Sequence, residues 1–107
     1  MQGKISEAID CHQTSLHIYQ KLNCPQDEAM ALSNLGMTYA AQKSWEQATS
    51  HLEKSARIFG NLEDPNEIVP LRALTFIYFR QGKWRKAFGC LRRANSLSKH
   101  FDSADRH

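Results

Sequence analysis

Three side chains near the start of the chain have the chemistry of metal ligands: Cys11, His12 and His17. A metal site needs ligands that converge, but adjacent residues of a helix point about 100° apart. We therefore expect packed or solvated side chains here, and neither a metal nor a cofactor. Cys11, Cys24 and Cys90 are the three cysteines, and they lack CxxC spacing. Their odd number argues against a disulfide framework or a zinc module and favours a reducing, cytoplasmic environment.

Known catalytic motifs are absent from the sequence. Catalysis needs a nucleophile or an acid–base pair that is brought together in a pocket. The chain contains no GxSxG or HExxH motif, and its five glycines are too scattered to form a phosphate-binding loop. The sequence therefore predicts that the protein is not an enzyme.

Charge is distributed unevenly along the chain, although the formal net charge is only +3. Residues 1–67 hold five Lys/Arg and nine Asp/Glu, whereas residues 68–101 hold eight Lys/Arg and no acidic residue. Such a basic segment favours an acidic partner or an acidic neighbouring surface. The first residues form no apolar run typical of a signal peptide, and no stretch approaches the roughly 20 apolar residues that span a bilayer. We therefore expect an intracellular protein that does not enter a membrane.

Helix signals divide the chain into five segments with short turns. Pro25 suits the first turn of a helix, and Ser44 with Gln47 forms a capping-box signal. Asn23 and Gly82 are typical of residues at which helices stop. The expected helices are 4–22, 25–42, 44–62, a fourth from Asn66 or Pro70 to Gly82, and 83–100, followed by a polar tail at 102–107.

A pattern of large and small residues predicts that the second and third helices pack closely. Gly36 and Ala48 are small enough for two backbones to approach, while Leu35, Tyr39 and Leu52 fill the flanking space. The pattern recurs 39 residues later, and half of it occurs 40 residues earlier. Leu32, Leu35, Gly36, Tyr39, Ala48 and Leu52 correspond to Leu71, Leu74, Thr75, Tyr78, Ala87 and Leu91, and the half copy is Gly3, Ile5, Ala8 and His12.

This pattern resembles the tetratricopeptide repeat family. The resemblance implies an all-α fold in which helical hairpin repeats form a short right-handed α-solenoid, with about two and a half repeats and five helices. One domain over 1–107 would contain a half repeat at 3–23, repeats at 25–63 and 66–101, and the tail at 102–107. Departures from the family pattern are Thr75 for the usual Gly, His12 for an apolar residue, and a period of 39–40 instead of about 34. The longer period is similar to that of adaptors that orient the mitotic spindle or carry motor cargo.

The resemblance also implies that the first helix of each repeat lines a concave groove that binds a partner protein. Apolar anchors beside arginine and asparagine suit a peptide with acidic and apolar residues, because arginine can grip a carboxylate with two hydrogen bonds. In the alternative interpretation, Met37 and Phe76 pack between helices and the arginines are solvated. We expect a scaffold or adaptor that binds such a peptide. Helical spacing assigns to this groove Met30, Ser33, Asn34, Met37, Arg72, Phe76, Phe79 and Arg80.

Nucleic-acid binding is the competing interpretation of the basic segment. Phosphate contacts from its cations would give binding a steep salt dependence. Trp84 lies among these cations, but it occupies the position of Trp45, which the repeat pattern uses for packing rather than for base stacking. A third interpretation is a docking surface for an acidic part of a longer protein. The cations are Arg80, Lys83, Arg85, Lys86, Arg92 and Arg93.

The first helix lacks the partner that precedes it in a complete repeat, because the pattern enters at the equivalent of Lys43. The helix at 4–22 would then have a neighbour on one side only, and its apolar residues cannot all face that neighbour. We expect either self-association through this helix or membership of a longer array. The apolar residues concerned are Ile5, Ile9, Leu16 and Ile18.

Overall fold

The chain folds into a row of five α-helices. The computed structural model describes the backbone of residues 2–105 and the side chains of residues 3–100. Residues 2–105 contain no β-strand, so the predicted all-α fold is confirmed. A single turn of 3-10 helix, η1, leads into the fourth helix. The elements are α1 (Gln2–Lys21), α2 (Pro25–Ala41), α3 (Trp45–Asn61), η1 (Pro65–Glu67), α4 (Ile68–Arg80) and α5 (Trp84–Asp105).

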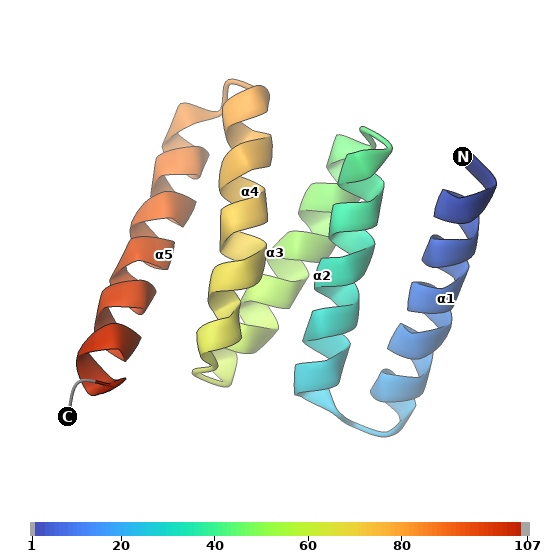
Figure 1. The fold of residues 1–107 in the computed structure, drawn as a ribbon, viewed down its shortest axis with the longest axis horizontal. Coiled ribbons are helices and arrows are strands. Elements are labelled where there is room, and N and C mark those ends of the chain that lie inside the picture. The colour runs from blue at the N-terminus through green and yellow to red at the C-terminus, as the bar shows by residue number, and fades with distance from the viewer. Residues whose placement is uncertain (1, 106–107) are drawn as a thin grey trace.

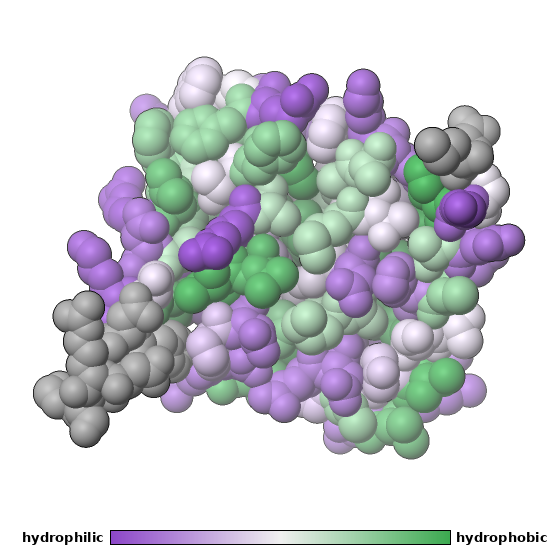
Figure 2. Space-filling view, in the orientation of Figure 1, coloured by the Kyte–Doolittle hydropathy of each residue, from purple (hydrophilic) through white to green (hydrophobic). Residues whose placement is uncertain are grey.

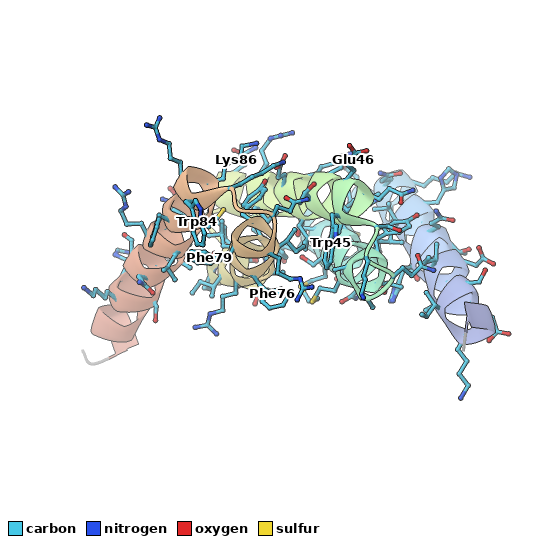
Figure 3. All side chains as sticks on the ribbon, turned by 90° about the horizontal axis from the view of Figure 1, so that it is seen from above. Trp45, Glu46, Phe76, Phe79, Trp84 and Lys86 are labelled. Carbon is cyan, nitrogen blue, oxygen red and sulfur yellow. The ribbon has the colours of Figure 1, made fainter. Side chains whose placement is uncertain are left out.

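Successive helices run in opposite directions and form a curved layer that is two helices deep where α3 packs behind α2 and α4. α2 and α4 lie at the front of Figure 1, and α3 lies behind them. Seen from above, α1 and α5 slope away on the two sides of α3, so that the layer is arched (Figure 3). The layer is thin, with dimensions of 45 × 37 × 19 Å. α2 and α4 therefore form the concave face, and α3 forms the convex face.

Each of the four turns between α-helices is closed by the same pair of backbone hydrogen bonds. In the first turn, Asn23 has a left-handed backbone with φ 57°, and the N–H of Cys24 donates to the carbonyl of Tyr19 at 3.0 Å. This is the Schellman arrangement. The predicted stops at Asn23 and Gly82 are confirmed, since Gly82 has φ 74°. Lys43 and Glu63 adopt the same conformation without being residue types that signal it.

Three predicted details at helix ends are wrong. Ser44 occupies the cap position of α3, but its side chain makes no capping hydrogen bond. The fourth helix is entered through η1, where the carboxylate of Asp64 accepts from the N–H of Asn66 at 2.9 Å. α5 continues to Asp105, so the predicted tail is helical as far as the structure describes it, and residues 106–107 lie outside the described part.

The predicted close approach of two backbones is confirmed at Gly36. A Cβ atom there would lie 2.5 Å from Cγ of Leu52 and 3.1 Å from the carbonyl oxygen of Ala48. Only glycine fits at that distance. The core continues from this contact across α3 into the second hairpin. Its buried members are Ala48, Leu52, Leu74, Ile77, Tyr78 and Ala87.

The apolar residues of α1 are only partly covered. Ile5, Ile9 and Leu16 are half-buried, whereas Ile18 is exposed. The remaining surface of α1 is polar and carries both charge signs. Of the four residues expected on a bare face, Ile18 is thus the one that is exposed.

Candidate functional site

The concave side of α4 presents a row of three residues spaced four apart: Arg72, Phe76 and Arg80. Such spacing places side chains on one face of a helix. Phe76 is 61% exposed, and both arginines are exposed. Figure 2 shows this face, with apolar side chains gathered over α4 and along its border with α5. The row therefore combines an exposed aromatic ring with two guanidinium groups.

Arg80 joins the two hairpins of the chain. Its guanidinium carbon lies 5.6 Å from the ring centroid of Trp45 on α3 and 5.8 Å from that of Phe76 on its own helix. Both distances allow attraction between a cation and an aromatic face. No described carboxylate pairs with Arg80. The two rings thus orient a guanidinium whose hydrogen-bond donors remain available on the concave face.

A hollow of about 510 Å³ continues this face between α1 and α2. Asn34 and Met37, two of the residues assigned to the groove from the sequence, line it from α2. Met30 is also exposed, one and two turns before them. The walls are mostly apolar, with a few polar groups at the edges. The residues are Lys4, Ile5, Ala8 and His12 from α1, and Asn34, Met37, Thr38 and Ala41 from α2.

Ser33 does not belong to this face, although helical spacing assigns it there. It is fully buried between α2 and α3, where its hydroxyl lies 2.6 Å from the hydroxyl of Ser55. The Ser55 hydroxyl also donates to the carbonyl of Ala29 at 2.7 Å. A short hydroxyl side chain at the edge of a helix face can turn inward and bond there. Ser33 therefore stabilises the hairpin and is unavailable to a ligand.

Phe79 is likewise turned away from the concave groove. Its ring packs edge-on against Trp84 and Phe88 of α5, with both centroid distances 5.4 Å. Figure 3 shows Phe79 and Trp84 together at the border of α4 and α5, while Phe76 projects on the concave side. Phe79 thus anchors α5 to α4.

The basic segment does not form one free cationic face. Arg93 donates two hydrogen bonds of 3.1 Å to the buried carboxylate of Glu67, which raises the pKa of its guanidinium. Lys86 lies over the ring of Tyr78 at 5.6 Å, on the convex side. Three of the six cations considered for nucleic-acid binding, Arg80, Lys86 and Arg93, therefore contact residues of other elements of the fold. The nearby Trp84 packs against Phe79, as the sequence predicts, yet remains 58% exposed.

The described residues contain no group of three His, Cys, Asp or Glu side chains arranged to hold a metal ion. Cys11 is exposed, and the three cysteines are free thiols. No described helix has both the length and the apolar character to cross a membrane.

Comparison with known proteins identifies the repeat. The family model described as tetratricopeptide repeat matches twice, over residues 1–59 and 27–99. The chain belongs to the tetratricopeptide repeat family. A solved structure, the apo form of RapI, has the same fold with a TM-score of 0.86 over 95% of this chain, at 22% sequence identity. The chain spans 37% of the length of that RapI chain. No curated protein sequence matches.

The fold and the family support a protein-interaction scaffold, because stacked repeats of this kind present extended concave surfaces.

In this tetratricopeptide array, sequence reasoning missed one recurring contact between repeats. The hydroxyl of Tyr78 donates to the carboxylate of Glu53, and the equivalent Tyr39 accepts from the amide of Gln13 at 3.4 Å. The repeat period could have predicted this contact, since Gln13 and Glu53 are 40 residues apart and Tyr39 and Tyr78 are 39 residues apart. Each pair links a second helix to the first helix of the next repeat.

Proposed function

We propose that this tetratricopeptide array is an adaptor that binds a peptide segment of a partner protein along its concave face, and that the segment carries both acidic and apolar residues. Arg72 and Arg80 would hold carboxylates, because a guanidinium matches a carboxylate with two parallel hydrogen bonds. Phe76 and Met37 would supply adaptable apolar contact. Asn34 offers an amide group to the peptide backbone in the hollow beside α1.

The observation that carries this proposal is the position of Arg80. An exposed arginine ordinarily samples many rotamers, which costs side-chain entropy when a ligand fixes it. Here the rings of Trp45 and Phe76 both lie within 6 Å of the guanidinium and restrict it. An arginine that is oriented before binding loses less entropy when it grips a carboxylate.

The test is a double charge reversal, Arg72→Glu with Arg80→Glu, followed by affinity capture of partners from cell extract. We expect the captured partners to be lost while the helical circular dichroism signal stays unchanged. The matched control is Lys54→Glu with Arg57→Glu, which reverses two exposed charges on α3. Recovery of the same partners at the same strength by both double variants would refute the assignment.

Peptide arrays sharpen the chemistry of the ligand. Mixed acidic and apolar peptides should bind the wild-type protein more tightly than the same peptides with lysine in place of each acidic residue. A gel-shift assay with unrelated RNA and DNA at low salt provides the counter-test. Strong nucleic-acid binding together with indifference to the acidic peptides would favour the competing interpretation.

A further inference from the structure

Two equivalent glutamates of the repeat have different neighbours. In the first repeat, the side-chain amide of Gln20, near the end of α1, donates to the carboxylate of Glu28 in α2 at 3.4 Å. By the 39–40-residue period, the equivalent of Glu28 is Glu67 in η1, and the equivalent of Gln20 is Gly60 near the end of α3. Gly60 therefore leaves open, beside Glu67, the space that the side chain of Gln20 occupies beside Glu28.

A partly enclosed hollow of about 380 Å³ lies at this place, at the lower ends of α3 and α5 in Figure 1. A Cβ atom at position 60 would lie 3.5 Å from both carboxylate oxygens of Glu67, so the carboxylate turns its edge toward the missing side chain. Glu67 itself is only 7% exposed. We call this space the Glu67 hollow. Its lining residues are Gly60, Glu63, Glu67, Arg93, Leu97 and His100.

Arg93 closes one side of the Glu67 hollow but occupies only part of the carboxylate. Its two hydrogen bonds of 3.1 Å to Glu67 use two of the roughly four lone-pair positions that a carboxylate offers. Glu63 and Glu67 contribute two negative charges to the lining, and Arg93 contributes one positive charge. With His100 counted as neutral, one negative charge is left in excess. A ligand with a single positive charge would balance it.

We propose that the Glu67 hollow binds an alkylammonium group, such as the side chain of a lysine of a partner protein. An ammonium carries three N–H donors and no acceptor, so it would donate to the remaining lone pairs of Glu67 and to the carboxylate of Glu63. The alkyl stem would lie against Leu97, since lysine stems pack on apolar surface while their charged ends stay with polar partners. The ligand would thus supply the donor that Gln20 supplies in the first repeat.

The Glu67 hollow lies inside the array and not at one of its ends. The end of α3 forms one wall and α5 forms the other. A further repeat at either end would contact α1 or the opposite side of α5, because each repeat contacts only its neighbours. The hollow is also separate from the concave groove, since none of its lining residues belongs to α2 or α4. Its failure in an experiment would therefore leave the proposed function untouched.

Titration of the isotope-labelled protein with n-butylammonium chloride, followed by NMR, tests the site. We expect chemical-shift changes concentrated on the amides of Gly60, Glu67 and Arg93, with half-saturation in the millimolar range. The control titrant is n-butanol, which has the same stem without the charge and should bind at least about tenfold more weakly. Lysine with blocked α-amino and carboxyl groups is the second probe. We expect it to bind at least as tightly as butylammonium, whereas binding of butylammonium alone would assign the hollow to a free alkylamine.

Variants of the protein then test the role of the missing side chain. Gly60→Gln rebuilds the arrangement of the first repeat, so binding of both amines should be lost while the melting temperature rises. Gly60→Ala is the matched control, because it brings a similar gain in helix propensity but leaves most of the hollow open, and it should bind as the wild-type protein does. Glu67→Gln removes the charge and should weaken binding by at least about tenfold. Circular dichroism verifies that each variant is folded.

Three results would overturn the proposal. The first is that neither amine changes the chemical shifts around Gly60. The second is that n-butanol binds as tightly as butylammonium, since the carboxylates would then play no part. The third is that Gly60→Gln binds butylammonium as tightly as the wild-type protein does. These three results do not require Glu67→Gln to fold, so the test holds even where that variant is unstable.

Discussion

The two complete hairpins of this protein are built on one pattern but pack differently. In the α2–α3 hairpin, Gly36 lets Leu52 approach so closely that a Cβ at position 36 would lie 2.5 Å from Cγ of Leu52. In the α4–α5 hairpin the equivalent residue is Thr75, whose hydroxyl donates to the carbonyl of Leu71 at 2.8 Å within its own helix. Leu91, the equivalent of Leu52, is 36% exposed, whereas Leu52 is fully buried.

Two physical causes separate the hairpins. Thr75 carries the Cβ that Gly36 lacks, so α5 cannot approach α4 as α3 approaches α2. In addition, α3 has a helix on each side, while α5 has α4 on one side only within the described chain. Leucine therefore contributes differently to stability in the two hairpins. Its contribution depends on whether the facing residue has a Cβ atom and on whether a further helix covers the leucine.

The largest predicted effect concerns the two equivalent leucines. Leu52→Ala should lower the free energy of unfolding by about 3 kcal/mol, because it leaves a cavity in the buried core. Leu91→Ala should lower it by about 1 kcal/mol, because its side chain is already partly in water. Urea denaturation of the two variants measures both values. Equal losses would contradict the described difference in burial.

The second prediction tests the close approach at Gly36. Gly36→Ala should destabilise the protein by about 2 kcal/mol, since the new methyl group collides with Leu52 and with the backbone of Ala48. The control is Gly89→Ala, at an α5 position with no atom within 4 Å of the new Cβ. There the better helix propensity of alanine should stabilise the protein by up to about 1 kcal/mol. Thermal unfolding should thus shift in opposite directions for the two substitutions.

The third prediction concerns the ion pair that closes the second hairpin. Arg93→Ala should cost about 1–2 kcal/mol, because it leaves the buried carboxylate of Glu67 without its donors. Because the Arg93 side chain is half-exposed, water screens the ion pair, and the loss of stability is smaller than for a fully buried ion pair. Lys54 is the equivalent in the first hairpin and is exposed, so Lys54→Ala should change stability by less than about 0.5 kcal/mol. Chemical denaturation distinguishes the two.

The smallest effect is expected at Tyr78. Burial first, and then the hydrogen bond to Glu53, raise the pKa of its phenol above the ordinary value of about 10. Since the folded-state pKa is higher than the unfolded one, this stabilisation is present at neutral pH and is lost as pH rises above about 10. Tyr78→Phe should lower the free energy of unfolding by about 1 kcal/mol at pH 7. Between pH 9 and 11, the stability of this variant should fall less steeply than that of the wild-type protein. An identical pH profile for wild type and variant would contradict the assignment.

The sequence predicts the number of helices and most of their boundaries because those features depend on local chemistry. Asn23, Pro25 and Gly82 each mark a helix end by backbone preference alone, and the structure agrees at all three. The left-handed backbone of Lys43 and Glu63 could not be predicted in this way. There the backbone hydrogen bonds of the turn impose a conformation that these residue types do not favour. The repeat pattern recovers the closely packed hairpin through Gly36.

The candidate site was predicted less accurately than the helices. Helical spacing assigns a residue to a face of the helix, but it does not show whether a side chain at the edge of that face points inward or outward. Ser33 and Arg72 are equivalent positions, yet Ser33 turns inward to bond Ser55 and Arg72 extends into water. Side-chain length and charge make that difference. The position of Phe79 was mispredicted for a similar reason. Its ring packs against aromatic residues of α5 and does not lie on the concave face of its own helix.

The Schellman turns have a consequence for how the chain folds. Every reversal of direction is fixed by hydrogen bonds between residues at most five apart, and nearly all helix packing is between neighbours in sequence. Formation of one hairpin therefore closes only a short loop, which favours rapid folding. The α2–α3 hairpin, with its glycine contact, is the natural nucleus, and growth can spread from it toward both ends as in a one-dimensional chain. Amide protons of α3 should then exchange with solvent most slowly, and those of α1 and α5 first.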